Sequence, residues 1–313
     1  MGRPNTGDAK VDKILSSFSQ FYTNLDYIAD AILPIVKVKN KTGKYAKYGK
    51  ENFRAYIDQI FRAPGTRAHT VDYSVSQGNY ICEERSIEKP VPDEFYDNTD
   101  DPYDPERDAV AVIKDNIAVN KELALAMVMA DTNVLTQNTT LSGTSQWSDV
   151  VNSDPIGDIT TGIKTVRVAT GSRPNVMVLG LASFQVLKNH PAIREQLKYT
   201  NSGQPSDDQL SAFLKSYFRL KEVLIGEAVY NSATEGQSDV LDDIWGDNVW
   251  LISRAKTPTL MRASFGYTIM DVPDQVDIYR EESHLRNVVR ARVSFDQNIM
   301  DATLGYLIKD TNA

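Results

Sequence analysis

Few residues in this chain could do chemistry. The histidines are His69, His190 and His284, and Cys82 is the single cysteine. No HExxH, no pair of histidines at metal-ligand spacing and no GxSxG stands among them. Two glutamates follow Cys82 and would oppose a thiolate, so a structural thiol is favoured over a nucleophile. The sequence predicts no catalytic centre, metal site or cofactor.

One stretch raises the question of a phosphate site. The segment VMVLGLASFQVLKNHP, residues 176–191, predicts a buried strand that leads through Gly180 directly into a helix. A phosphate cradle needs several glycines whose N–H groups close on the anion, and neither GxGxxG nor GK[ST] occurs. We therefore expect Gly180 to serve packing.

Carboxylates crowd residues 93–108. A calcium loop would need oxygen ligands at its positions 1, 3 and 5 and a glycine at 6, which are missing. A helix start fits better, with Asp104 as the N-cap and Pro105 as the first helical residue. The paired carboxylates of a glycosidase meet only in space, and nothing in the sequence points to them.

The bulk composition narrows the function classes. The chain has 313 residues, 41% of them hydrophobic and 24% charged, with a net charge of −8. That charge argues against a protein that grips nucleic acid or an anionic membrane. No apolar run approaches the roughly 18 residues of a membrane span, and the first residues lack a signal-peptide core. We expect a soluble protein, made in the cytoplasm, without a membrane partner.

The N-terminal third of the chain predicts three elements. Apolar residues at helical spacing predict a helix over about 9–33, which must pack on its own domain or on a neighbouring subunit. The lysine-rich segment 35–48 predicts an extended arm or edge hairpin with a turn at Thr42-Gly43; a solvated edge is favoured over nucleic-acid contact. Residues 66–92 alternate on both sides of Gln77-Gly78 and predict a long β-hairpin. This hairpin needs contacts outside itself.

The rest of the chain predicts a spine and two strand-rich units. A helix from Pro105 to about Asp131 should turn a regular set of side chains toward the core: Ala109, Ile113, Ile117, Leu123, Met127 and Ala130. Strands alternate with helices over residues 151–262, which predicts one α/β unit. Residues 263–313 alternate like antiparallel strands and should pair with earlier strands near the spine helix.

The order of these elements, with several local motifs, resembles the tailed-phage major capsid protein fold named after phage Hong Kong 97, which encapsulin shells also use. The motifs that carry the resemblance, from about Leu33 onward, are YSVSQGNYICEERSIEKPVPDE, DPYDPERDA, QWSD, SDPIGDI, RPNVMVLG, LKNHPAI, LKYT, IWGDNVWL and SFGYT. The resemblance implies an α+β fold in four parts. These are an N-terminal arm (1–52), an E-loop (53–92), a P-domain (93–150 and 263–313) with the spine helix, and an α/β A-domain (151–262).

The same resemblance implies a function. The protein would be a major capsid protein whose copies, in pentamers and hexamers, form the icosahedral head around the double-stranded DNA of a tailed phage. It would be a virion component and not an enzyme, and it would contain DNA without reading its sequence. A portal, a scaffolding protein and a decoration protein are the further partners implied, and an encapsulin-like compartment is the alternative. The candidate inter-subunit contacts are Phe18, Phe21, Val71, Tyr73, Tyr80 and Ile87.

Overall fold

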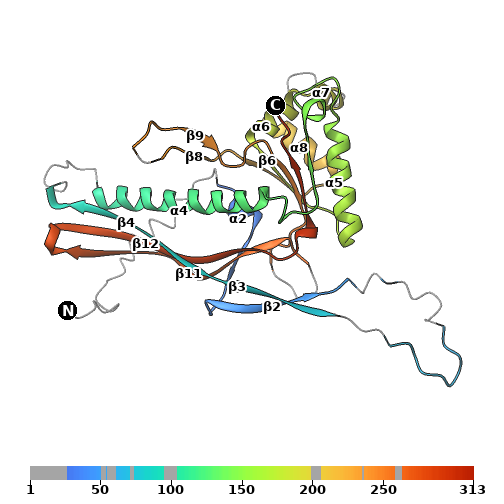
Figure 1. Cartoon of the computed structure of the whole chain (residues 1–313), viewed down its shortest axis with the longest axis horizontal. Coiled ribbons are helices and arrows are strands. Elements are labelled where there is room, and N and C mark those ends of the chain that lie inside the picture. The colour runs from blue at the N-terminus through green and yellow to red at the C-terminus, as the bar shows by residue number, and fades with distance from the viewer. Residues whose placement is uncertain are drawn as a thin grey trace.

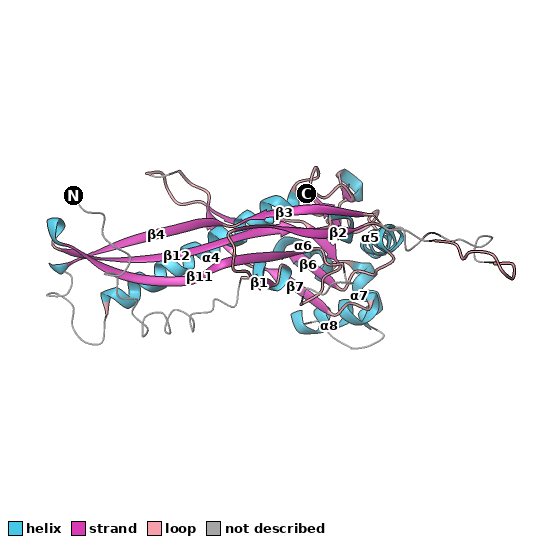
Figure 2. Ribbon diagram, turned by 90° about the horizontal axis from the view of Figure 1, so that it is seen from below, coloured by secondary structure: helices cyan, strands magenta, loops and turns pink. Residues whose placement is uncertain are grey.

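The computed structural model describes residues 27–50, 54, 61–70, 74–94, 104–198, 206–234, 236–257 and 263–313. Figure 1 shows a long sheet with one helix lying along it, an α/β unit at one end and a narrow pair of strands that projects away from both. Figure 2 shows the same sheet from below, with its strands running nearly parallel to the long axis of the molecule. The fold is therefore a mixture of helices and long antiparallel strands.

The long sheet has four strands in the order β1-β11-β12-β4. Their bounds are Ile35–Lys37, Gly266–Glu281, Arg286–Ile299 and Glu83–Pro92. β12 pairs antiparallel with both β11 and β4, whereas β1 pairs parallel with β11. A short 3-10 turn, Glu282–His284, joins β11 to β12. The expectation that the C-terminal strands pair with earlier strands is confirmed for β11 and β12.

Helix α4, Pro105–Ala130, lies along this sheet. Its first half buries Ala109, Ile113 and Ile117 against the sheet, as the spacing predicts. In its second half the prediction is wrong for Met127, which is 60% exposed. The buried residues there are Glu122, Leu125, Ala126 and Met129. The apolar stripe shifts because this half packs on the α/β unit and on α2 instead of on the long sheet.

The α/β unit contains a five-stranded sheet in the order β5-β13-β10-β6-β7. These strands span Asn138–Thr140, Gly305–Lys309, Val249–Ile252, Val176–Gly180 and Glu222–Gly226. Its helices are α5, α6, α7 and α8, which span Pro155–Thr170, Leu181–Asn189, Pro191–Lys198 and Asp207–Phe218. Two strands, β5 and β13, come from outside residues 151–262. The expectation of one α/β unit made only of 151–262 needs that correction, because β13 pairs with β10 across the sheet.

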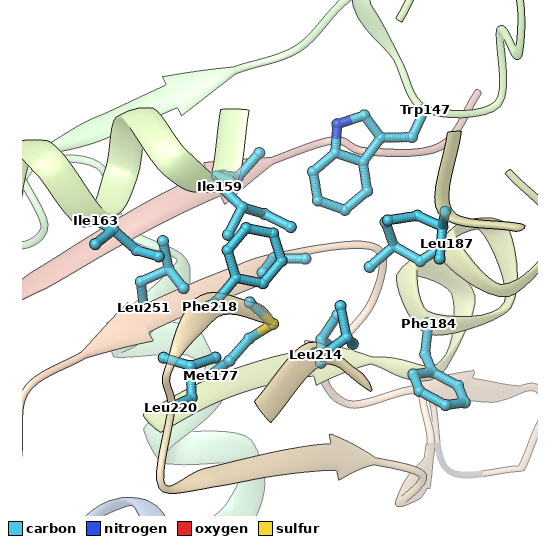
Figure 3. Close-up of a cluster of buried hydrophobic side chains, with 14 of the residues drawn as sticks. Trp147, Ile159, Ile163, Met177, Phe184, Leu187, Leu214, Phe218, Leu220 and Leu251 are labelled. Carbon is cyan, nitrogen blue, oxygen red and sulfur yellow. The ribbon is translucent and has the colours of Figure 1, made fainter. Parts of the chain in front are cut away.

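Two hydrophobic clusters cover the two faces of this sheet. On one face, shown in Figure 3, Trp147 packs with side chains of α5, α6 and α8, and Trp147, Ile159 and Leu187 are fully buried. The other face packs against α4 and the short helix α2, Ala29–Ile32. Burying a side chain of this size stabilises a fold by about 1.5–3 kcal/mol. The α/β unit thus carries the largest share of the core.

A small hairpin and a strand pair stand apart from both sheets. After β7 the chain forms a separate short strand, β8 (Val229–Asn231), which pairs with β9 (Leu241–Asp243). Strand β2 (Thr42–Tyr48) pairs with β3 (Val75–Ile81). Further 3-10 turns in the described part of the chain are Gly143–Ser145 and Ala302–Leu304.

Both turns predicted before residue 80 are wrong. Gln77-Gly78 and Thr42-Gly43 lie inside β3 and β2, and β3 is followed after Cys82 by β4, which joins the long sheet. The two glycines have another purpose. A Cβ at Gly78 would come within 2.3 Å of the Tyr45 ring, and a Cβ at Gly43 within 2.5 Å of the Tyr80 ring. Each glycine makes room for the aromatic ring of the opposite strand, so glycine here marks close packing instead of a turn.

Candidate assembly surfaces

The three histidines lie in different parts of the fold: His190 at the end of α6, His284 in the turn between β11 and β12, and His69 in the segment 61–70. His190 is buried at the start of α7; its Nε2 lies 3.1 Å from Ser153 Oγ, and its Nδ1 accepts the N–H of Ala192 at 3.2 Å. Burial lowers the pKa of His190. His69 and His284 are exposed. Within the described residues no group of His, Cys, Asp and Glu could hold a metal ion.

Cys82 is a buried thiol between β3 and β4. Its Sγ donates to the carbonyl of Ile269 at 3.5 Å. Burial, with the Asp271 carboxylate as a smaller cause, raises the pKa of Cys82 to about 11. The thiol therefore stays protonated at neutral pH, as expected of a structural cysteine.

Gly180 ends β6 and precedes α6. A Cβ there would lie 1.8 Å from the carbonyl oxygen of Gly246. The N–H of Gly180 donates to the carbonyl of Asn248 at 3.0 Å, so the chain is already in contact with its neighbour at this point. The absence of a side chain permits this approach. This contact gives Gly180 the packing purpose that the sequence suggests.

The start of α4 is formed by the two residues singled out for it. Asp104 is the N-cap residue, and its side chain accepts the N–H groups of Glu106 and Arg107 at 3.1 and 3.4 Å. Pro105 is the first residue of the helix. The carboxylates of the first turn also lie at the positive end of the helix dipole, which stabilises them there.

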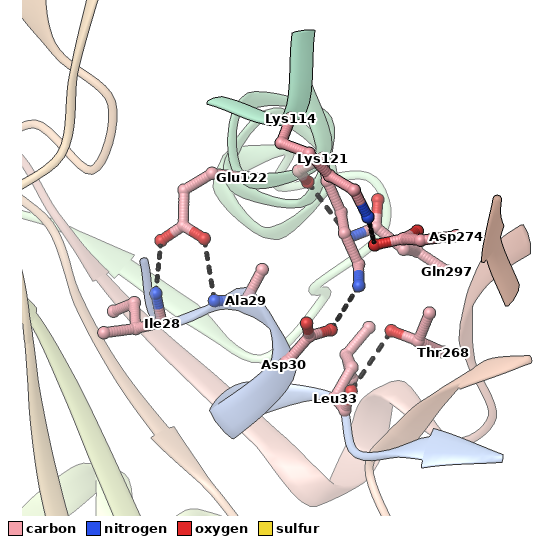
Figure 4. A network of polar contacts seen from close by, with 10 residues as sticks. All are labelled: Ile28, Ala29, Asp30, Leu33, Lys114, Lys121, Glu122, Thr268, Asp274 and Gln297. Atoms are coloured by element: carbon pink, nitrogen blue, oxygen red, sulfur yellow. Dashed lines mark hydrogen bonds and ion pairs between the residues drawn. The ribbon is translucent and has the colours of Figure 1, made fainter. Parts of the chain in front are cut away.

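A buried carboxylate joins the middle of α4 to the N-terminal segment. Glu122 is fully buried, and it accepts the N–H groups of Ile28 and Ala29 at 3.0 and 2.7 Å and the indole N–H of Trp245 at 2.7 Å (Figure 4). Burial raises the pKa of Glu122, against the opposite effect of the three donors. Since the first N–H groups of a helix have no partner within it, Glu122 supplies what the start of α2 lacks.

Polar contacts beside Glu122 extend this junction. Lys121 pairs with Asp30 of α2, and its carbonyl accepts a hydrogen bond from Gln297 at 3.0 Å. Lys114 pairs with Asp274 at 2.6 Å (Figure 4). Helix α4 is thus bonded to α2 on one side and to β11 and β12 on the other. Sequence analysis did not single out Glu122. Its position was a signal, because Leu125 and Met129 follow it by three and seven residues and so lie on the same face of the helix.

The strand pair β2–β3 has little core of its own. The described residues of β3 are exposed or half-buried, with Val75 at 49% and Ile81 at 60% exposure. Beyond the pair, residues 61–70 are exposed throughout, and Phe61 is 84% exposed. Tyr45 Oη donates to Asn298 at 2.8 Å and ties the base of the pair to β12. From here on, the arm denotes residues 42–81, that is β2, β3 and the segment between them, and not the N-terminal segment 1–52.

The predicted inter-subunit contacts are not all described. Phe18, Phe21, Val71 and Tyr73 lie outside the described residues. Tyr80 lies on β3, half-buried against Gly43. Ile87 lies on β4, half-buried, and packs against the core between α4 and the long sheet. The structure does not bring these last two side chains into one cluster.

Comparison with known proteins identifies the family. No helix in the described part of the chain is long and apolar enough to cross a membrane, and no protein-family model matches the sequence. The major capsid protein of Burkholderia phage BcepMu is 29% identical over 312 residues, which cover 96% of this chain and 97% of that protein. The major capsid protein of Pseudomonas phage JBD67 is 30% identical over 269 residues, 82% of each chain.

Solved structures agree with these relatives. A phage-related protein from Bordetella bronchiseptica superposes with a TM-score of 0.75 at 25% identity, covering 97% of this chain and 98% of its own. The mature capsid of bacteriophage PhiM1 shares the fold with a TM-score of 0.55 at 10% identity, over 100% and 93% of the two chains. The mixed fold of long strands, spine helix and α/β unit is thus that of phage capsid proteins, and the chain belongs to the family of bacteriophage major capsid proteins.

Proposed function

We propose that this chain is the shell subunit of a tailed-phage head, whose copies assemble as pentamers and hexamers into an icosahedral capsid around double-stranded DNA. One observation of the structure carries the proposal beyond family membership. The described residues of the arm expose apolar side chains, Phe61, Val75 and Ile81 among them, and form almost no core of their own. Such a strand pair is marginal alone, so the surface that completes it belongs to another subunit.

The parts of the fold have distinct purposes in this proposal. The arm corresponds to an E-loop over a neighbour, with Tyr80 near the contact. Ile87 lies outside the arm, on β4 of the long sheet. The long sheet with α4 corresponds to the P-domain, and the α/β unit, β5 and β13 included, to the A-domain that gathers around the symmetry axes. Each contact is modest, and closed symmetry adds many of them together. The purpose of the protein is structural, not enzymatic.

The charge of the chain fits containment of DNA. With a net charge of −8, the wall does not attract the phosphate backbone tightly, which suits a packed genome that must later leave. A portal, a scaffolding protein and a decoration protein are the partners that such a head would use. The curated relatives are phage capsid proteins, which favours this reading over an encapsulin-like compartment.

The test is assembly with and without residues 51–73 of the arm. The unmodified chain, expressed alone and with its neighbouring genes, is expected to form closed shells or capsomer rings under negative-stain electron microscopy. In the variant, residues 51–73 are replaced by Asn-Gly. The ends are suited to closure, because Tyr48 pairs with Val75 and the N–H of Gly49 donates to the carbonyl of Ser74 at 2.9 Å.

The shortened variant should fold and remain a monomer or small oligomer. A cut that extends to residue 88 is less informative, because Glu83–Pro92 is a strand of the long sheet and its removal would also damage the fold. Intact shells from the 51–73 variant would count against an assembly purpose for the arm. A dispersed unmodified chain, even with its neighbouring genes present, would count against the proposed function.

A further inference from the structure

Two segments of this chain carry opposite and nearly unmixed charge. Residues 37–50 contain six lysines and no carboxylate. Between Lys221 and Arg254 stand seven carboxylates and no Lys, Arg or His. The chain as a whole mixes 34 basic with 42 acidic residues, so two such stretches are a departure from its average. Segregated charge of this kind is typical of surfaces that recognise each other.

The middle of the acidic segment forms a hairpin that stands apart from the five-stranded sheet. We call residues 227–243, with β8 and β9, the acidic hairpin. Its exposed carboxylates are Glu227, Asp239, Asp242 and Asp243. None of these four is in an ion pair within the described part of the chain. Apolar side chains are exposed between the charges, with Val240 at 51% and Leu241 at 68%. Exposed apolar residues rimmed by charge are the composition of a contact surface.

The basic segment contains β2, the first strand of the arm. Lys44 is exposed, and Lys47 lies with its Nζ 5.5 Å from the Tyr45 ring centre. The paired strands, residues 42–48 and 75–81, contain no carboxylate that could neutralise them. Among the described residues, no lysine of 37–50 forms an ion pair. We call β2–β3 the basic ribbon.

The two surfaces cannot meet within one subunit. In Figure 1 the acidic hairpin lies beyond α4, whereas the basic ribbon lies on the other side of the long sheet, so α4 and the sheet separate them. A complementary pair on opposite sides of one chain makes a head-to-tail contact between two copies. Such a contact differs from a two-fold one because repetition closes it into a ring when the rotation allows.

We propose that the acidic hairpin of one subunit docks on the basic ribbon of a second copy, and that this contact selects the neighbour within a capsomer ring. The inference rests on the proposed shell function. The second copy is the occupant because the complementary charge and the required separation are both present in this chain. Exposed charge pairs act mainly on the encounter rate and the choice of partner, and Val240 and Leu241 add apolar area to the contact. Because such pairs are screened within about 8 Å at physiological salt, assembly should weaken as salt rises.

The test is a charge swap. One variant carries D242K/D243K and a second carries K44E/K47E. In the part of the chain that the structure describes, neither Asp242, Asp243 nor Lys44 is in an ion pair that the swap would break. A third variant combines all four changes. The matched control, E195K/D208K, reverses two exposed carboxylates on α7 and α8. All are expressed under the conditions in which the unmodified chain assembles, and the assembled fraction is measured by sedimentation and negative-stain microscopy.

Each pair of reversals alone is expected to lower the assembled fraction about tenfold, and the four changes together to restore it to within about twofold. The control should assemble like the unmodified chain. Thermal melts monitored by circular dichroism report whether each variant folds; D242N/D243N and K44Q/K47Q replace any that does not.

Three results would overturn the contact. Normal assembly of both single-pair variants would show that the two surfaces do not meet. Loss in both without recovery in the combined variant would show that each surface meets something other than the other. Equal loss in the control would show an effect of charge in general. Failure of the unmodified chain to assemble with its neighbouring genes would remove the proposed function instead, and this contact with it.

Discussion

The α/β unit and the arm of this subunit are built on opposite principles. Every residue of β6 and β10 is buried, and the sheet is covered on both faces by apolar clusters. No described residue of β3 is buried, and the arm is held by backbone pairing and a few contacts at its base. The α/β unit therefore has a hydrophobic core on both faces of its sheet within one chain. In the proposed shell the arm is completed by a surface of another subunit, so we expect stability and assembly to be separable in this molecule.

The largest loss of stability is expected from a substitution in the core of the α/β unit. Trp250 is 1% exposed, packs edge-on to Trp245 at 5.2 Å, and donates to the carbonyl of Met129 at 2.8 Å. Trp250→Ala should lower the free energy of unfolding by about 3–5 kcal/mol, through lost burial and the cavity left behind. Urea denaturation of the unassembled subunit measures this. Val151→Ala, at a site 83% exposed, is the control and should change it by less than about 0.5 kcal/mol.

A second change tests the junction between the regions. Glu122→Leu keeps a side chain of similar size but leaves the N–H groups of Ile28, Ala29 and the Trp245 indole without their acceptor. The expected loss is about 1–3 kcal/mol, because unsatisfied buried donors keep their full desolvation cost. Hydrogen exchange at Ile28 and Ala29 should accelerate in the variant. Asn120→Leu, on the exposed side of α4, is the control; equal exchange in both variants would contradict the assignment.

The third test asks whether a buried polar group of the α/β unit responds to pH. Burial lowers the folded-state pKa of His190 below 6.5, and protonation at Nδ1 would remove the acceptor of the Ala192 N–H. The unfolded chain therefore binds the proton more readily. The stabilising contribution is complete above about pH 6.5 and is lost as pH falls through the lower folded pKa. Denaturation midpoints of wild type and His190→Gln between about pH 7.5 and 5.5 measure it; a parallel pH dependence of the two proteins would exclude His190.

The smallest expected effect on stability lies in the arm. Ile81→Ser, at a site 60% exposed, should change the free energy of unfolding by less than about 0.5 kcal/mol and yet lower the yield of assembled particles. Sedimentation and urea denaturation on one preparation give both quantities. Val151→Ser is a control with similar chemistry at another exposed site. A loss of stability in Ile81→Ser with normal assembly would reverse the contrast between the two regions.

The same contrast explains what the sequence could and could not predict. The spine helix, with its cap at Asp104, and the alternating strands and helices of the α/β unit follow from local periodicity and capping residues. The turns expected at Thr42-Gly43 and Gln77-Gly78 were wrong. These glycines leave space for aromatic rings on the opposite strand, a contact that can be recognised only once the strand pairing is known. The partners of Glu122 are the N–H groups of Ile28 and Ala29, 94 and 93 positions away. Strand β13 enters the second sheet by pairing with β10 and β5, which are far from it in sequence. The capsid family itself was predicted from ordered motifs, not from periodicity.

The parallel pairing of β1 with β11 has a consequence for how the subunit folds. Ile35 pairs with Thr268, and β4 pairs with a strand that begins at Arg286, so the long sheet needs both ends of the chain. Most contacts within the α/β unit join residues closer in sequence, and closing a long loop costs entropy before its contacts repay it. We expect the helices and inner strands of the α/β unit to gain protection first and the long sheet last, in pulsed hydrogen exchange during refolding. A newly made subunit would then acquire its α/β unit before the frame from which the arm extends, which delays association until folding is nearly complete.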